Sequence, residues 1–351
     1  MSGVLSLARP EILALQAYEH ASWEPSLERL HANELPWRAE GDHTSAGLNR
    51  YPEPQPRELI ERLASLYDVA PERVLVGRGS DEAIDLLTRG FCRAGQDSIV
   101  ICPPTFGMYS VAARIQGAEV HRVPLRKDRG FAVDEPAVLK AAAQNAKLVF
   151  LCSPNNPTGN LLEESMLLRL AEALTDRALL VVDEAYMEFA AAPSLARFIT
   201  QFPHIAVLRT LSKAHAMAGA RCGVLIAAPD VVKLLRKVIP PYALTQMTIE
   251  TTMRQLEPAQ LAATQGRLQT IRQERERLTR VFKESAQVVR VWPSDANFLL
   301  IEFHSPDDVI ARTRAARLLI RDVRSQPGLG SALRISVGTP EQNDRLLEAL
   351  R

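Results

Sequence analysis

Residues 205–223 read IAVLRTLSKAHAMAGARCG, and this stretch decides the fold. Its first six residues favour a buried strand, which runs into a turn of small residues that presents Ser212 and Lys213. Arg221 follows eight residues after the lysine, and another apolar segment begins immediately afterwards. A lysine becomes a carbonyl nucleophile when burial or a neighbouring cation lowers its pKa. A single lysine at a turn is usually a surface residue, so the rest of the chain must decide.

The segments around this stretch alternate between apolar strands and amphipathic helices. Strands are predicted at 73–77, 97–102, 119–125, 147–152, 178–183, 205–210 and 222–228, and helices at 58–67, 80–91, 105–117, 134–145 and 163–175. Strands that are apolar throughout belong in a sheet buried on both faces, which is the parallel α/β class. After about residue 229 a long charged helix (roughly 255–287) and strands at 297–303, 318–323 and 332–338 predict a smaller α+β domain.

The composition excludes several classes of function. A chain of 351 residues favours two domains, and a net charge of +1 gives no attraction to nucleic acid or to an anionic membrane. The four cysteines form no CxxC pair and the seven histidines have no metal-ligand spacing, so we expect reduced thiols and no metal. The N-terminus lacks a signal-peptide pattern, and no apolar run reaches the ~20 residues of a membrane helix. We therefore expect a cytoplasmic protein.

Two polar groups are predicted at the carboxyl ends of strands, where α/β sheets bind ligands. The strand 178–183 ends in Asp183, and a carboxylate there could keep a pyridine nitrogen protonated, as pyridoxal-5′-phosphate (PLP) chemistry requires. It could equally cap a helix. The turn SPNNPTG at 153–159 is rigidified by two prolines, and the amide of Asn156 could donate to the phenolate oxygen of such a ring.

The sequence GRGSDE at 77–82 joins a predicted strand to a predicted helix. Backbone N–H groups at a helix N-terminus can hold a phosphate, here with Arg221 as the cation. Asp81 and Glu82 could instead satisfy the helix dipole themselves. The pattern is not GxGxxG, because Glu82 stands at the last glycine's place, so a nicotinamide-dependent dehydrogenase has little support.

Two arginines, Arg321 and Arg334, lie in otherwise apolar predicted strands of the smaller domain. Such an arginine usually needs an anionic partner. The sequence leaves open whether that partner is a bound carboxylate or phosphate, or an internal salt bridge.

Seven stretches, in this order along the chain, resemble the fold-type I, aspartate-aminotransferase-like PLP enzymes and most of all the histidinol-phosphate aminotransferases. They are NRYPEPQP (49–56), GRGSDEAIDLL (77–87), CPPTFGMYS (102–110), CSPNNPTG (152–159), VVDEAYMEF (181–189), RTLSKAHAMAGARCG (209–223) and ALRISVGT (332–339). The likeness covers nearly the whole chain, from His31 to Thr339.

The resemblance implies a role for each matching residue around the cofactor ring. Lys213 would be the Schiff-base lysine and would shuttle a proton during catalysis. Asp183 would pair with the pyridinium nitrogen. Asn156 and Tyr186 would hydrogen-bond the phenolate oxygen, and Phe106 would stack on the ring.

The resemblance also implies how phosphate and substrate are held. The cofactor phosphate would bind the backbone of Ser80 and Asp81 together with Ser212, Arg221 and, from the partner subunit, Tyr51, so that the enzyme is a homodimer. Arg321 and Arg334 would bind the substrate's anionic end, and Asn156 and Tyr51 would also contact the substrate. Relatives place an aromatic residue of the N-terminal segment over the substrate; Tyr18 and Trp23 are the candidates.

The implied fold is PLP fold type I. It has an N-terminal arm (1–44) that joins the small domain and the dimer contact. A large PLP-binding domain (45–240) holds a seven-stranded, mostly parallel sheet between helices, and a small C-terminal domain follows (241–351). The implied reaction passes an amino group from L-glutamate to imidazole-acetol phosphate, giving L-histidinol phosphate and 2-oxoglutarate.

Other readings share parts of this pattern. Aminotransferases for aromatic or branched amino acids and threonine-phosphate decarboxylases have the same PLP-holding residues. A PLP-binding regulator without turnover usually carries a basic DNA-binding module, which this chain lacks.

Overall fold

The computed structural model describes residues 3–19, 21, 24 and 26–351, and Trp23 lies outside the described residues. Its larger sheet has seven strands in the order β1-β7-β6-β5-β4-β2-β3. Their bounds are β1 Val74–Gly77, β2 Ser98–Ile101, β3 Glu119–Arg122, β4 Ala146–Cys152, β5 Leu179–Asp183, β6 Ile205–Thr210 and β7 Gly223–Ile226. Only β7 runs antiparallel to its neighbours, β1 and β6. The prediction of a seven-stranded, mostly parallel sheet is therefore confirmed.

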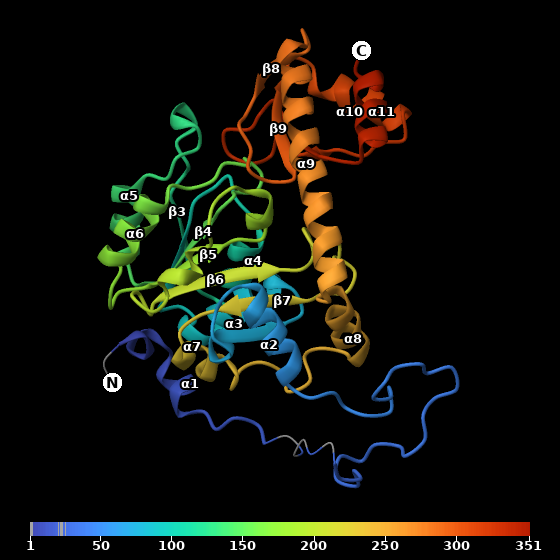
Figure 1. Cartoon of the computed structure of the whole chain (residues 1–351). Coiled ribbons are helices and arrows are strands. Elements are labelled where there is room, and N and C mark those ends of the chain that lie inside the picture. The colour runs from blue at the N-terminus through green and yellow to red at the C-terminus, as the bar shows by residue number, and fades with distance from the viewer. Residues whose placement is uncertain (1–2, 20, 22–23, 25) are drawn as a thin grey trace.

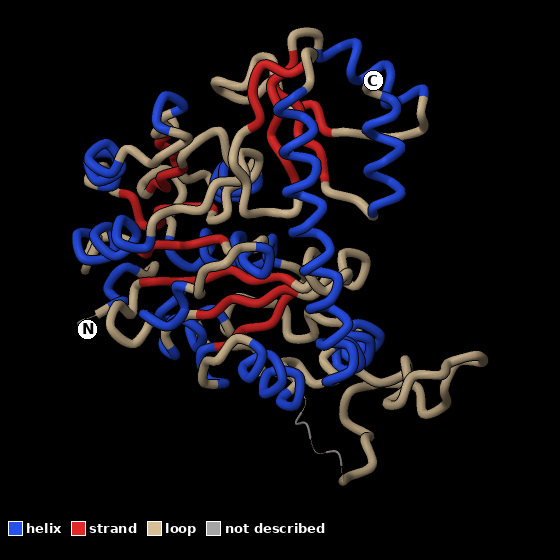
Figure 2. The backbone as a smooth tube through the Cα atoms, turned by 45° about the horizontal axis from the view of Figure 1, so that its top comes forward, coloured by secondary structure: helices blue, strands red, loops and turns tan. Residues whose placement is uncertain are grey.

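Helices cover both faces of this sheet (Figure 2). They are α2 Arg57–Leu66, α3 Ser80–Phe91, α4 Met108–Gln116, α5 Glu135–Ala142, α6 Glu164–Ala173 and α7 Pro229–Leu235. Every residue of β1, β2, β5, β6 and β7 is buried, as expected for strands with helices on two sides. Of the two edge strands, β1 is fully buried, whereas β3 is partly exposed.

A second, antiparallel sheet has the order β10-β11-β9-β8. Its strands are β8 Val288–Val291, β9 Phe298–Phe303, β10 Arg321–Asp322 and β11 Ala332–Ser336, accompanied by α10 Pro306–Ala315 and α11 Pro340–Ala349. This sheet has a hydrophobic core of its own, which includes Leu299, Ile301 and Leu346. The strand predicted at 318–323 is shorter than expected and contains two residues.

The long charged helix predicted at 255–287 is confirmed as a single helix that runs from residue 258 to 284, and a separate helix precedes it. α8 (Gln246–Gln255) ends shortly before Pro258, which is the first residue of α9 (Pro258–Glu284). Proline cannot continue a helix but is well placed at its first position, and this explains the break. Figure 1 shows α9 rising from α8 beside the large sheet to β8 of the second sheet.

The N-terminal arm begins with the short helices η1 (Val4–Leu7) and α1 (Pro10–Ala14). Val4, Leu7 and Ala8 pack into the core of the large sheet rather than onto the second sheet. Residues 26–44 of the arm extend away from both sheets in Figure 1. The domain boundaries expected near residues 45 and 241 stay a prediction. Among the described residues, no helix has both the length and the apolar character needed to cross a membrane.

Candidate active site

The carboxyl ends of β4, β5 and β6 meet at one edge of the large sheet and carry Cys152, Asp183 and Thr210. A cavity of about 130 Å³ lies at this edge. It is lined by nine of the residues singled out from the sequence: Ser80, Asp81, Phe106, Asn156, Asp183, Tyr186, Ser212, Lys213 and Arg221. Residues that lie up to 141 positions apart in the chain therefore surround one space.

Asp183 is buried at the floor of this cavity, with 3% of its surface exposed. Burial raises the pKa of its carboxyl to about 6. The hydroxyl of Tyr109 donates to Oδ2 at 2.7 Å, and the N–H of Ala185 donates to Oδ1 at 3.1 Å. Because both donors are neutral, a cation placed in the cavity would stabilise the buried negative charge most strongly. A protonated pyridine nitrogen is such a cation.

Tyr109 is the functional residue that the sequence analysis missed. It lies on α4, is fully buried, and stacks on Phe150 with 4.9 Å between ring centroids. Its position within CPPTFGMYS, three residues after Phe106, was the available signal. Nothing in the local sequence shows that its hydroxyl meets a carboxylate 74 residues away.

Lys213 follows β6 in the small-residue turn and remains exposed at the cavity. The low-polarity surroundings are the main cause that lowers the pKa of its amine, and the nearby charge of Arg334 adds to this. The Nζ atom lies 5.7 Å from the centre of the Tyr186 ring. A lysine with a lowered pKa is the form that attacks an aldehyde carbon.

The second sheet reaches this cavity through Arg334 on β11. Its Nη1 donates to Oδ1 of Asn156, and the Nδ2 of Asn156 donates to the Tyr186 hydroxyl at 3.3 Å. Burial raises the pKa of that hydroxyl above its ordinary value. Tyr186 also packs edge-to-face on Phe298 of β9. The side chains of Asn156 and Tyr186 are thus fixed from both sheets.

Arg321 lies directly opposite Arg334 in the antiparallel pairing of β10 and β11. Like charges at opposed positions destabilise a strand pair unless something neutralises them. Within the described part of the chain neither arginine forms a salt bridge, and the buried Nε of Arg334 has no hydrogen-bond partner there. The internal salt bridge that the sequence left open is therefore not seen. Arg334 contacts Asn156, and Arg321 presents a second cationic group directly opposite Arg334.

The N-terminus of α3 lies at one end of the cavity and has the features of an anion-binding site. Gly79 precedes the helix and has no side chain to cap it, so the N–H groups of Ser80 and Asp81 are placed for an anion. The guanidinium of Arg221 lies 3.3 Å from Oδ2 of Asp81 and 3.5 Å from Oγ of Ser212. Helix N-terminus, hydroxyl and guanidinium together form a phosphate cradle.

Two glycines make this cradle possible. A Cβ at Gly79 (φ 84°) would lie 2.6 Å from Nη2 of Arg221. A Cβ at Gly223 would lie 2.2 Å from the carbonyl carbon of Gly79 and 2.3 Å from the nitrogen of Ser80. Backbone therefore passes against backbone at the start of β7, and a side chain would fill the cradle. With the carboxylate of Asp183, the amine of Lys213 and the aromatic lining of Phe106, the residues fit PLP.

Tyr51 does not line this chain's cavity. It is exposed in the irregular segment that follows the arm, where its ring stacks on Tyr242 with centroids 4.4 Å apart. Tyr18, a candidate for contact with the substrate, lines a separate surface hollow with Glu53 and Arg236. One copy of the chain therefore brings neither tyrosine to Lys213.

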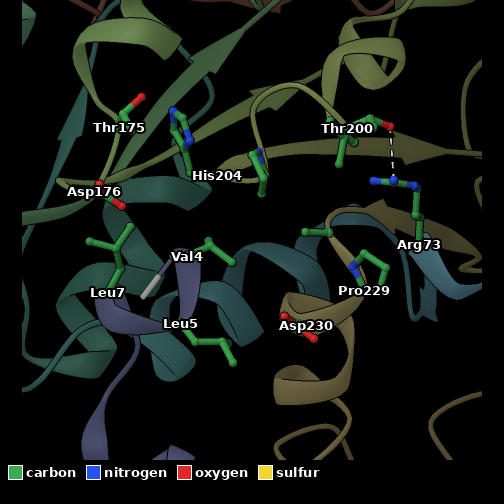
Figure 3. Close-up of a pocket in the computed structure, with 14 residues that line it drawn as sticks. Val4, Leu5, Leu7, Arg73, Thr175, Asp176, Thr200, His204, Pro229 and Asp230 are labelled. Atoms are coloured by element: carbon green, nitrogen blue, oxygen red, sulfur yellow. Dashed lines mark hydrogen bonds between the residues drawn. The ribbon is translucent and has the colours of Figure 1, made fainter. Parts of the chain in front are cut away.

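A larger cavity, of about 460 Å³, lies on the other edge of the sheet (Figure 3). Its lining includes Arg73 and His204, which directly precede β1 and β6, so it is at the amino ends of these strands. The guanidinium of Arg73 donates a hydrogen bond to the hydroxyl of Thr200, and the ring of His204 contacts the carbonyl of Ala171. Ligands of α/β sheets bind at the carboxyl ends. The smaller cavity, where the reactive groups converge, is the candidate active site.

Comparisons with known proteins identify a family, a relative of similar sequence and two similar structures. Residues 28–350 match the model of the family described as aminotransferase class I and II. A histidinol-phosphate aminotransferase of Stenotrophomonas maltophilia (strain R551-3) is 46% identical, over 99% of this chain and 96% of that protein.

Two crystal structures share the fold. The histidinol-phosphate aminotransferase from Clostridium acetobutylicum has a TM-score of 0.79 at 21% identity, over 86% of this chain and 90% of that one. The enzyme from Sinorhizobium meliloti, solved in complex with pyridoxal-5′-phosphate, has a TM-score of 0.77 at 25% identity, over 86% of this chain and 82% of that one.

Proposed function

This chain belongs to the class I and II aminotransferases, and we propose that it is the transaminase that converts L-glutamate and imidazole-acetol phosphate into 2-oxoglutarate and L-histidinol phosphate. The cofactor is PLP, which fits the carboxylate, amine and phosphate cradle of the cavity. Relatives that cover the full chain at 43–46% identity bear the matching name. The observation that favours a phosphorylated substrate is the opposed pair Arg321 and Arg334.

When bound, PLP supplies an electron sink that makes the substrate's Cα–H acidic. The chain's own residues do the rest. Asp183, buried between neutral donors, keeps a proton on the pyridine nitrogen. Asn156 and Tyr186, whose side chains hydrogen-bond each other, would hold the phenolate oxygen. Lys213 would hold the cofactor at its aldehyde carbon through Nζ, and its amine, with its lowered pKa, would be the group that moves the proton at the substrate's Cα.

The remaining residues hold and orient. Ser212, Arg221 and the N–H groups at the start of α3 bind the cofactor phosphate. Phe106 covers the ring and excludes water. Arg334 and Arg321 bind the anionic end of the substrate, and Asn156, held by Arg334, orients it.

The enzyme works as a homodimer in which Tyr51 of each chain completes the partner's cavity. Two observations support this arrangement. Tyr51 is exposed and lies away from its own chain's Lys213 cavity. Exposed apolar side chains also gather between residues 15 and 51, as a surface that a second copy covers would require. A cytoplasmic location is supported by the four cysteines, which are all free and buried.

The test is a titration of the purified PLP-loaded protein, followed through the visible absorbance of the lysine-bound cofactor. L-histidinol phosphate, L-glutamate and L-phenylalanine are added in parallel. We expect histidinol phosphate to convert the cofactor to its amino form at far lower concentration than phenylalanine. If phenylalanine is preferred, the enzyme is an aromatic aminotransferase. Release of carbon dioxide from threonine phosphate would identify a decarboxylase.

Replacing Arg321 by alanine tests the phosphate contact. The variant should bind histidinol phosphate about tenfold to a hundredfold more weakly, because a charge-assisted contact of ~1.5–3 kcal/mol is lost, while glutamate changes little. Arg345→Ala, an exposed arginine of α11, is the matched control. Equal losses for both substrates would count against a phosphate at Arg321.

A further inference from the structure

The carboxylate of Glu34 and the guanidinium of Arg29 together hold both polar groups of the Tyr51 backbone. Oε1 of Glu34 accepts from the Tyr51 N–H at 2.7 Å and from Nη2 of Arg29 at 2.6 Å. Nη1 of the same Arg29 donates to the Tyr51 carbonyl at 3.0 Å. Oε2 of Glu34 accepts from Arg50, the residue before Tyr51, at 3.0 Å. One carboxylate thus organises two arginines around a single peptide segment.

This cluster is unusual for its setting. The described residues between Ala14 and Arg57 form no helix or strand, so no backbone ladder fixes them. Even so, only 4% of the Glu34 side chain is exposed. A buried carboxylate with three charge-assisted or backbone bonds is a strong restraint, and it opposes the entropy of a long irregular segment. The Tyr51 side chain, in contrast, remains exposed outside the cluster.

We propose that Glu34 is a positioning residue, which sets the direction in which the Tyr51 ring is offered to the partner's cofactor phosphate. The inference rests on the proposed function, in which Tyr51 acts in the partner's cavity. Glu34 itself touches neither cofactor nor substrate. Loss of Glu34 should therefore lower the affinity for PLP only through Tyr51. The effect should appear only in the partner's site, because that is the site which Tyr51 of the same chain completes.

The first experiment is a double-mutant cycle on the PLP dissociation constant of the full-length protein. Glu34→Gln keeps an oxygen for the Tyr51 N–H but loses the charge that gathers Arg29 and Arg50. We expect it to weaken PLP binding about tenfold, and Tyr51→Phe to do at least as much. The double variant should bind PLP no more weakly than Tyr51→Phe does. Additive losses would show that Glu34 acts by another route and would overturn the proposal.

The second experiment separates the two subunits. A Glu34→Gln chain with intact Lys213 is co-expressed, under a different tag, with a Lys213→Ala chain whose arm is intact. In the heterodimer the only cavity that keeps Lys213 is completed by the intact arm. Wild-type PLP affinity there, against weak affinity in the Glu34→Gln homodimer, is the expected result. Weak affinity in both would place the effect within the chain and contradict the proposal.

Glu28→Gln is the matched control, because it removes an arm carboxylate that is exposed and lies outside the cluster. It should bind PLP like the wild type; a tenfold loss would mean that any charge change on the arm suffices, which overturns the specific role of Glu34. Failure of the proposed function has a different signature. A wild-type protein that binds PLP but does not act on histidinol phosphate leaves both PLP readouts intact.

Discussion

Asp183 is a buried carboxylate whose charge the chain itself does not neutralise. Burial raises its pKa from 3.8 to about 6, so the folded, cofactor-free protein binds this proton more tightly than the unfolded chain does. The stability that this residue contributes is therefore fully present below about pH 4 and is lost as the pH rises through 6. The active-site carboxylate costs stability at neutral pH in return for binding the cofactor.

Because the pKa of Asp183 is raised in the folded protein, removing its charge should stabilise the fold at high pH. In cofactor-free protein, Asp183→Asn should raise the free energy of unfolding at pH 8 by up to ~3 kcal/mol, a gain that disappears near pH 4. Denaturant unfolding at the two pH values measures it. The exposed Asp176→Asn is the control. An equal effect of Asp183→Asn at both pH values would mean that folding does not raise the pKa of this carboxyl.

Among the individual residues, the sequence identifies the polar groups of the site, but it does not identify the neutral side chain that hydrogen-bonds one of them. Lys213, Asp183 and Asn156 stand in short motifs whose spacing marks them. Tyr109 is a buried aromatic on a helix, a pattern that usually means core packing. Its contact with Asp183 depends on how α4 packs over the ends of the strands, which only the folded chain decides.

At the scale of elements, the phosphate cradle depends on two chain segments that pass closer than side chains allow. Gly223 opens β7 and lies against Gly79 and Ser80 at the start of α3. Gly223→Ala should force these backbones apart, lower the affinity for PLP at least tenfold and cost about 1–3 kcal/mol of folding stability. PLP titration and denaturant unfolding measure the two effects.

Gly219→Ala is the matched control, because a Cβ there meets nothing within 4 Å. It lies in the same turn, four residues earlier, and should bind PLP normally. If Gly223→Ala also keeps wild-type affinity, the cradle is not where the phosphate binds.

The order of elements was predictable, while their directions and lengths were less so. The alternation of strands and helices predicts the large sheet, because apolar strands separated by helices must be covered on both faces. The sequence does not show that β7 enters antiparallel between β1 and β6. It also gave β10 six residues where the structure has two, since an edge strand is limited by its pairing with β11 rather than by its apolar content.

At the scale of the whole molecule, the two sheets are tied together next to the active site. Arg272 of α9 donates to the carbonyl of Glu188 at 2.6 Å, and Arg275 donates to the carbonyl of Ala296 at 2.8 Å. Lys127, from the large-sheet side, lies 2.8 Å from Glu302 on β9. The segment that carries Tyr186 is therefore held from the second sheet as well as from the first. Such contacts between distant segments have no signature in local sequence.

The segment from residue 15 to residue 51, which comprises most of the arm and the stretch that follows it, carries most of the exposed large apolar side chains in the described part of the chain. Of the fourteen such side chains in the described chain, eight lie between residues 15 and 51: Leu15, Tyr18, Leu27, Leu30, Leu35, Trp37, Leu48 and Tyr51. Leu30 is 89% exposed and Trp37 76%. A monomer would leave this apolar area in water, whereas a second copy laid against the arm would bury it.

The last prediction tests this surface. Replacing Leu30 and Trp37 together by serine should raise the dimer dissociation constant at least a hundredfold, because burying two such side chains contributes ~3 kcal/mol or more. Sedimentation velocity over a range of concentrations measures it. Leu319→Ser, equally exposed but on the second-sheet side, should not change the constant. Dissociation should also weaken PLP binding, because Tyr51 leaves with the partner. A dimer that survives the double replacement would show that the arm is not the contact, and the trans role of Tyr51 would fall with it.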